Sequence, residues 1–382
     1  MIDSLVEKLE KKVVLADGAM GTYFSQKYMT EMEAEEANIA TPERIIAIHK
    51  EYIEAGAELI RTNTFAVNHG LFAEAERRKE VIEAAVANAR EAVRQSRKEV
   101  VVAASVGPIR QSAEEEDGEI WKEYTQMLDV FYTLGIRVFL FETFSELRWL
   151  PKLAKYCKNK EEQTVVIAEL ALNPMGYTQH GFGMTEILQE LTSDVNFDIV
   201  GFNCGVGALH MKKLLQSQKF PKEFLLSVFP NAGYQQEMQG RTQVFHDTAY
   251  YAGQMKEILA LGANLVGGCC GTTPEHIKKL VEECKDLPLR EIEKKHDTIV
   301  SSYGQAVILD DMPRIIGERI NPTGKKKFKE ALKNEDMDYI LKEAITQQDK
   351  GAHILDVNVG LPDIDEVAMM EKVVKEHQGR TS

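Results

Sequence analysis

The chain has 382 residues, of which 44% are hydrophobic and 28% charged, and its formal net charge is −14 at pH 7. This composition is that of a globular protein with a sizeable core, and the length exceeds that of one ordinary domain. The acidic balance argues against nucleic acid or an anionic membrane surface as the main partner. The N-terminus is charged rather than a signal peptide, no apolar run reaches transmembrane length, and five cysteines form no disulfide framework. We therefore expect a cytoplasmic protein.

Short apolar segments alternate with longer helical patterns over residues 1–290. Apolar residues at three- and four-residue spacing predict amphipathic helices over 42–55, 81–98 and 250–260. The predicted strands are 13–16, 58–61, 100–104, 138–141, 165–170, 199–202, 224–228 and 265–268. Eight such units over this length predict an α/β fold, a (β/α)8 TIM barrel. A doubly wound sheet is the alternative, but the loop at 17–22, DGAMGT, lacks its GxGxxG phosphate loop.

Polar residues and cysteines follow the predicted strands directly. Asp17 comes after the first strand, Glu142 after the fourth, Cys204 after the sixth and the Cys269–Cys270 pair after the eighth. The carboxyl ends of all strands of a barrel form one face, and active sites of this fold lie there. We therefore expect these residues, although distant in sequence, to lie within reach of one another.

The adjacent cysteines, Cys269 and Cys270, are flanked by glycines and precede a helix expected to begin at Pro274. Neighbouring side chains on a strand point to opposite faces, so the strand must turn here if both thiols bind one metal, and the glycines permit that turn. The nearby helix N-terminus favours thiolate. Cys204 is the candidate third ligand. Three thiolates with one open position are typical of catalytic zinc.

A second pattern begins after a predicted linker at 291–312. Strands are expected at 314–317 and 353–357 with a helix at 338–350 between them, and the lysines at 325–327 are interpreted as a solvated helix start. A lone β-α-β unit cannot close a barrel or bury both faces of its strands. We interpret residues 313–382 as the opening of a second barrel that is incomplete in this chain.

Several motifs together carry a resemblance to a known family. The segments DGAMGT, TNTF, GFNCG and GGCCGTTPEHI resemble the homocysteine-binding domain of zinc-dependent homocysteine methyltransferases. The segments IGERINPTGKKKFKEAL and LDVNVG are similar to the start of the pterin-binding domain in the cobalamin-dependent methionine synthase family. The resemblance covers essentially the whole chain, in the order of those domains.

The resemblance implies a role for each matching residue. Zinc is expected to bind Cys204, Cys269 and Cys270. A pterin is expected near polar residues of the segment 313–382. Homocysteine is expected to place its amino group near Asp17 and Glu142 and its carboxylate at the amides of Gly18 and Ala19. The expected pterin contacts are Glu318, Asn321, Asp356 and Asn358.

Structural alternatives stay open for three of these residues. Asp17 can simply terminate a strand and hold a turn. Glu142 can be an ion-paired core carboxylate. Asn203 is expected either to contact the substrate or only to orient the loop that carries Cys204.

The expected activity is zinc-dependent methyl transfer to homocysteine, giving methionine. By resemblance, the donor is methylcobalamin, held by a corrinoid-binding module outside this chain and recharged from 5-methyltetrahydrofolate. One alternative is a stand-alone methyltransferase that uses a sulfonium or betaine donor. Another is a non-catalytic zinc-binding scaffold, which would have four protein ligands.

Overall fold

The computed structural model describes residues 5–111, 116–218, 224–233, 235–238, 241–244, 247–284, 298–301, 306–309, 312–362 and 364–378. The chain divides into two compact units, Met1–Glu293 and Lys294–Ser382. Most of the linker expected at 291–312 lies outside the described residues. Within them, no helix combines the length and the apolar character needed to cross a membrane.

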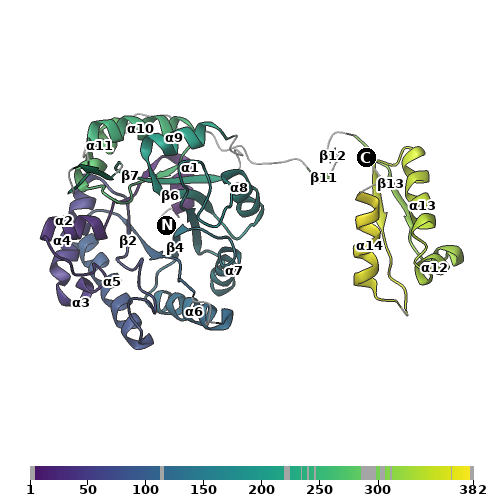
Figure 1. Cartoon of the computed structure of the whole chain (residues 1–382), viewed down its shortest axis with the longest axis horizontal. Helices are drawn as coiled ribbons and strands as arrows, with labels where there is room; N and C mark the ends of the chain where they lie inside the picture. The colour runs from purple at the N-terminus through teal and green to yellow at the C-terminus, as the bar shows by residue number, and fades with distance from the viewer. Residues whose placement is uncertain are drawn as a thin grey trace. The chain divides into compact units, whose positions relative to one another are not determined.

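Eight parallel strands form the centre of the first unit. They are β1 (Val14–Leu15), β2 (Leu59–Arg61), β3 (Val101–Val106), β4 (Val138–Phe144), β5 (Val165–Leu170), β6 (Ile199–Gly207), β7 (Leu225–Asn231) and β10 (Leu265–Val266). Their order is β1-β10-β7-β6-β5-β4-β3-β2. Hydrogen bonds from Glu58 N to Leu15 O and from Asp17 N to Leu59 O connect β1 with β2 and join the two ends of the sheet. The unit is a TIM barrel, as predicted, with helices outside the ring of strands (Figure 1).

Helices connect most of these strands. They are α1 (Leu5–Lys11), α2 (Gly21–Tyr28), α3 (Ala37–Ala40), α4 (Pro42–Ala55), α5 (Ala75–Ser96), α6 (Asp117–Thr133), α7 (Leu150–Lys160), α8 (Met184–Ser193), α9 (Ala208–Gln216), α10 (Thr248–Ala260) and α11 (Pro274–Cys284). A hairpin of β8 (Gln235–Met238) and β9 (Arg241–Val244) follows β7. The predicted helix 42–55 is confirmed by α4, which begins at Pro42 and ends before Gly56 in the left-handed conformation. The predicted helix 250–260 begins earlier, because Asp247 caps α10 by accepting the N–H of Tyr250.

The barrel interior changes from apolar to polar along the strands. At the amino ends, one apolar cluster fills the interior and includes Leu59, Ala103, Leu140, Ile167, Ile199 and Leu225. Leu5 and Leu9 of α1 pack into this cluster. Two residues further along the same strands, hence on the same face, stand Arg61, Ser105, Glu142, Glu169, Gly201 and Ser227. The apolar layer therefore supports a polar layer beneath the carboxyl-end face.

The second unit is small. Parallel strands β13 (Ile316–Ile320) and β14 (Ile354–Val357) pack with α12 (Lys326–Lys333), α13 (Met337–Asp349) and α14 (Glu366–Gln378). A separate hairpin consists of β11 (Ile299–Ser301) and β12 (Ala306–Ile308). The predicted β-α-β order is confirmed, but the first strand extends through Glu318, which was expected in a loop. The reason is Ile320, which is buried among the helices and pairs with Val357.

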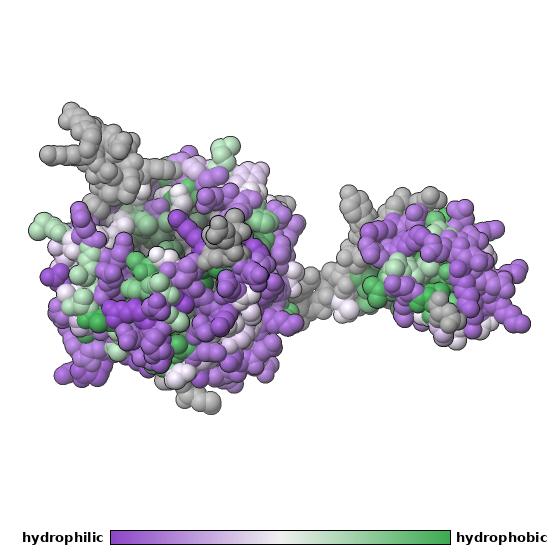
Figure 2. All heavy atoms as spheres, turned by 60° about the horizontal axis from the view of Figure 1, so that its bottom comes forward, coloured by the Kyte–Doolittle hydropathy of each residue, from purple (hydrophilic) through white to green (hydrophobic). Residues whose placement is uncertain are grey.

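Charged and polar side chains cover most of the visible surface of the first unit, and apolar side chains form small patches between them (Figure 2). This distribution agrees with the acidic, strongly charged composition.

A candidate metal centre beside a buried charge cluster

Three cysteine side chains converge at the carboxyl-end face of the barrel. Cys204 lies near the end of β6, and Cys269 and Cys270 follow β10. The three Sγ atoms lie within 4.8 Å of one another, and Cys204 Sγ is 3.8 Å from Cys270 Sγ. A tetrahedral zinc ion with Zn–S bonds of about 2.3 Å holds its sulfur ligands about 3.8 Å apart. The spacing of the three thiols therefore fits one zinc ion. None of the five cysteines forms a disulfide, so all three thiols are available as ligands.

The backbone bends sharply to present Cys204. Its φ is +53°, and Gly205 follows at +69°. A Cβ on Gly205 would lie 2.1 Å from the carbonyl oxygen of Leu172, so only glycine fits there. A non-glycine residue with positive φ costs conformational energy and is common at functional sites.

Thr272 fixes the turn that carries the other two cysteines. Its Oγ1 donates to the carbonyl of Cys269 (2.7 Å) and accepts the N–H of Ala19 (2.9 Å). The hydroxyl of Thr272 therefore connects the cysteine turn with the loop after β1. The helix α11 begins at Pro274, as predicted. A Cβ at Gly268 would lie 2.4 Å from the same Oγ1, which explains the glycine before the cysteine pair.

Hydrogen bonds among the three thiols give them different pKa values. Hydrogen bonds from Cys269 and Cys270 lower the pKa of Cys204 to about 3. The same hydrogen bond to Cys204 raises the pKa of Cys270 to about 11 and that of Cys269 well above its ordinary value. A bound cation would favour the ionised form of all three thiols.

Arg61 organises the polar layer below the cysteines. Its Nε donates to Asp17 Oδ1 (2.7 Å) and its Nη1 to Glu142 Oε2 (2.9 Å). Its Nη2 donates to the carbonyls of Gly18 (2.7 Å) and Gly268 (2.8 Å). The guanidinium therefore connects β2 with the ends of β1, β4 and β10, and its contact with Gly268 is one residue from the cysteine pair.

This cluster carries one net negative charge when both acids are ionised. Asp17, Arg61 and Glu142 are 2%, 8% and 5% exposed. Burial raises the pKa of Asp17, while Arg61 opposes that rise. Although burial alone would lower the pKa of Arg61, Asp17 and Glu142 raise it above its ordinary value. The uncompensated negative charge can accept a cationic group of a ligand.

Asn203 and Ser105 hold Glu142 and its neighbour in place. Ser105 donates to Glu142 Oε1. Asn203 accepts the N–H of Thr143 and donates to Thr143 Oγ1, both at 2.8 Å. Thr143 has a φ of +64°, so this pair of hydrogen bonds stabilises a strained residue. Asn203 is fully buried and is not among the residues that line the pocket, which favours the positioning role, and its contact with substrate stays a prediction.

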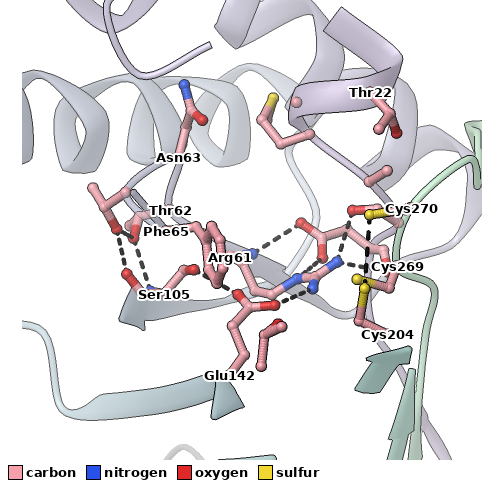
Figure 3. A pocket seen from close by; sticks show the side chains of 17 residues that line it. Thr22, Arg61, Thr62, Asn63, Phe65, Ser105, Glu142, Cys204, Cys269 and Cys270 are labelled. Carbon is pink, nitrogen blue, oxygen red and sulfur yellow. Dashed lines mark hydrogen bonds and ion pairs between the residues drawn. The ribbon is translucent and has the colours of Figure 1, made fainter. Parts of the chain in front are cut away.

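A pocket of about 260 Å³ connects the charge cluster with the metal centre. Figure 3 shows the three cysteines on one side of it, Ser105 and Thr62 on the other, and Arg61 between them. Asp17, Gly18, Ala19 and Glu142, all predicted to contact the substrate, line it. The Ala19 N–H already donates to Thr272, whereas the N–H groups of residues 18 and 20–22, at the start of α2, have no partner among the described residues.

Sequence reasoning assigned no role in the pocket to Arg61, Thr272 or Ser105. Arg61 could have been found from its position in the predicted strand 58–61. It is two residues after the interior Leu59, so its charged side chain must point to the same, interior face of the strand. The hydrogen bond from Ala19 N to Thr272 Oγ1 could not be found this way, because it depends on the approach of the first and last barrel strands.

Of the predicted pterin residues, Glu318 and Asp356 lie within β13 and β14, and Asn321 and Asn358 directly follow these strands. Asn358 N donates to Ile320 O (2.8 Å), which brings Asn321 and Asn358 to the ends of paired strands. Glu318 is largely exposed and lies 4.0 Å from Lys325 Nζ. Asp356, in β14, is also exposed.

Comparisons with known proteins agree with this architecture. The pattern that defines the family described as homocysteine S-methyltransferase matches residues 14–284. Methionine synthase of Mycobacterium tuberculosis is 30% identical over 397 aligned residues, covering 96% of this chain and 33% of that protein. The methionine synthase of Mycobacterium leprae is 29% identical, covering 93% and 32%. The chain therefore spans about a third of the length of these relatives.

Solved structures show the same fold. The metallated form of the homocysteine methyltransferase MmuM from Escherichia coli superposes with a TM-score of 0.58 at 21% identity, covering 70% of this chain and 95% of that one. Its apo form gives a TM-score of 0.55 at 22% identity, covering 71% and 96%. Because the family pattern spans most of the chain and includes all three cysteines, the chain belongs to the homocysteine S-methyltransferase family.

Proposed function

We propose that this protein transfers a methyl group to homocysteine, giving methionine, with zinc held by Cys204, Cys269 and Cys270. The observation that carries the proposal is the convergence of three Sγ atoms within 4.8 Å beside a pocket with an anionic cluster. Three thiolate ligands leave one position of a tetrahedral site for a substrate thiol. A zinc ion bound there would lower the pKa of that thiol and keep it as a nucleophilic thiolate.

The pocket residues orient the rest of the amino acid. The substrate ammonium binds beside Glu142, where the cluster with Asp17 and Arg61 retains one negative charge. The substrate carboxylate accepts hydrogen bonds from the unpartnered N–H groups of Gly18 and of residues 20–22, where the α2 dipole favours an anion. Ala19 contributes to the wall of the pocket rather than an amide donor, because its N–H donates to Thr272.

The methyl donor we propose is methylcobalamin, recharged from 5-methyltetrahydrofolate in a longer enzyme. This part of the proposal is supported by relatives named methionine synthase, which this chain matches beyond the first barrel. The corrinoid-binding module would be a separate partner. We further propose that residues 1–290 form the homocysteine unit, and that 313–382 begin a pterin unit with Glu318, Asn321, Asp356 and Asn358 at its site.

The zinc assignment is tested with Cys270→Ala. We expect this variant to lose stoichiometric zinc and methyl transfer from methylcobalamin to homocysteine together. Cys284→Ala is the matched control, because Cys284 is a buried free thiol at the end of α11. Retention of both zinc and activity in Cys270→Ala would refute the assignment.

The open coordination position is tested by X-ray absorption at the zinc edge. Adding homocysteine should replace one light ligand with a fourth sulfur. A scaffold with four protein ligands would give the same spectrum with and without homocysteine. Supplying S-methylmethionine or betaine in place of methylcobalamin identifies the donor, and turnover with those donors alone would contradict the cobalamin proposal.

A further inference from the structure

Glu169 is a buried carboxyl that the chemistry above does not use. It lies on β5 inside the barrel and is fully buried. Neither of its carboxyl oxygens has a hydrogen-bond partner among the described residues. Burying a carboxyl without partners costs free energy, so an unpaired acid inside a barrel calls for a reason beyond packing.

The neighbours of Glu169 on β6 and β7 supply no counter-charge. Register pairs Glu169 with Gly201 on β6, and Gly201 with Ser227 on β7. A Cβ on Gly201 would lie 2.1 Å from Ser227 Oγ, so β6 must present a bare backbone here. The layer beneath it is the apolar cluster with Ile167 and Leu225. The charged residues in the same layer of the barrel interior are Arg61 and Glu142.

Two charged groups of the substrate cluster act on Glu169. Glu142 on β4 disfavours its ionisation, and Arg61 on β2 favours it. Arg61 is already committed to Asp17, Glu142 and two backbone carbonyls, so it cannot serve as an ion-pair partner for Glu169 as well. Burial and Glu142 together raise the pKa of Glu169 to about 8, with smaller opposing effects from Ser227 and Arg61. Burial without a counter-charge thus favours the neutral form of Glu169 in the free protein at neutral pH.

We propose that Glu169 is a positioning residue whose ionisation is coupled to the binding of the substrate ammonium beside Glu142. The proposal rests on the proposed function, because it takes the ammonium from that substrate. When the cation arrives, it cancels the repulsion from Glu142 and adds an attraction. The O–H bond of Glu169 breaks, the proton passes to solvent buffer, and the carboxylate stays as a fixed anion beneath the ammonium.

The coupling has a defined sign. If the ammonium favours ionised Glu169, ionised Glu169 must favour the ammonium by the same factor. Each unit by which ligand binding lowers the pKa of Glu169 corresponds to about tenfold tighter binding once Glu169 is ionised. The affinity of the protein for homocysteine, relative to a variant without this acid, should therefore rise with pH.

The experiment measures homocysteine binding to the zinc-loaded full chain by calorimetry in two buffers that differ in ionisation enthalpy. This counts the protons released, which come from the thiol in every variant and additionally from Glu169 in the wild type. Glu169→Gln, an uncharged isostere, should release fewer protons. Between roughly pH 6 and roughly pH 9, the affinity ratio of wild type to variant should rise about tenfold per unit of pKa change. Equal proton counts and a constant ratio would overturn the proposal.

A ligand without the amino group provides the matched control. 4-Sulfanylbutanoate keeps the thiol and the carboxylate, so the wild type and Glu169→Gln should release equal numbers of protons on binding it. If Glu169→Gln does not fold, the test is made on the wild type alone, by comparing the number of protons released on binding of the two ligands. A larger release with homocysteine than with 4-sulfanylbutanoate supports the coupling, and equal release refutes it. Absence of homocysteine binding to the zinc-loaded wild type would instead contradict the proposed function.

Ser227→Ala supplies a graded test with a smaller structural change. Ser227 Oγ also lacks a hydrogen-bond partner among the described residues, and as a nearby donor it favours the ionised form of Glu169. Its removal should therefore shift the pH dependence of homocysteine affinity to higher pH. A profile that does not move, or that moves to lower pH, would contradict the coupling.

Discussion

At the scale of single residues, Arg61 has the greatest influence on the pocket. One guanidinium neutralises one of two buried acids and ties together the ends of four strands. Removing one partner of a buried ionic network costs more than the network contributes, because the remaining charges lose their compensation.

Arg61→Met should destabilise the protein by about 3–5 kcal/mol, the range for breaking a buried pair. It should also abolish homocysteine binding, because Asp17 and Glu142 would lose the guanidinium that holds both carboxyl groups in place. Thermal unfolding and calorimetric binding measure the two effects. Arg61→Lys is the control: a point charge keeps part of the stability, but it cannot reach all four acceptors. Full homocysteine affinity in Arg61→Met would contradict the role given to this residue.

Glu169 makes stability depend on pH. Its pKa in the folded protein, about 8, exceeds the ordinary value of 4.5 that the unfolded chain would have. Between these values the folded state retains a proton that the unfolded state has released, so stability falls as pH rises. Above about pH 8 the loss is complete.

Glu169→Gln should therefore be more stable than the wild type at pH 7, by a difference on the order of 3 kcal/mol, and nearly equal to it near pH 4. Urea unfolding at both pH values gives the difference. A stability difference that does not change with pH would show that Glu169 titrates normally.

At the scale of elements, the end of β6 decides where the third metal ligand lies. The strand carries Asn203, Cys204 and Gly205 in consecutive positions, with positive φ at the last two. A regular strand would direct Cys204 away from the cysteine pair, since successive side chains alternate between faces. The left-handed turn is therefore the local feature that makes a single metal site from three thiols.

Gly205→Ala should weaken zinc binding strongly. The added Cβ would approach Leu172 O to 2.1 Å and would require a strained φ of +69°. Zinc affinity measured by competition with a chelator reports the displacement of Cys204. Gly253→Ala is the control, because Gly253 lies in α10 with open space at its Cβ position, and helical Gly→Ala exchange stabilises by about 1 kcal/mol or less. Unchanged zinc affinity in Gly205→Ala would show that the turn does not position the ligand.

At the scale of the whole molecule, the proposed homocysteine chemistry is contained in the first unit. The cysteines, the charge cluster and Glu169 all belong to Met1–Glu293. An apolar cluster that includes Leu5 and Leu9 of α1 fills the barrel interior at the amino ends of the strands. The first unit therefore closes this end of the barrel with its own residues.

Residues 1–293 produced alone should bind zinc and homocysteine as the full chain does, because every group in the pocket comes from this unit. Metal analysis and calorimetry on both proteins make the comparison. A loss of zinc or homocysteine binding in the shorter protein, with its far-ultraviolet circular dichroism unchanged, would show that residues beyond 293 contribute to the site.

The sequence by itself determined the barrel and the three thiols. Eight apolar segments with helical patterns between them leave few other folds, and residues that follow parallel strands must gather at one face. Cys204, Cys269 and Cys270 could therefore be placed together without coordinates. In the second unit, the end of the first strand was misplaced, because the burial of Ile320 depends on helices that pack from elsewhere in the chain.

Tertiary structure alone decided how the charges are shared. Arg61 connects to Asp17 and Glu142, the Ala19 amide is taken by Thr272, and Asn203 supports Thr143 instead of facing the pocket. Glu169 lies unpaired beneath them. The sequence lists these groups but not their distances, and electrostatic and hydrogen-bond energies depend on distance and burial. Closure of the barrel sets both at once, by bringing its first and last strands side by side.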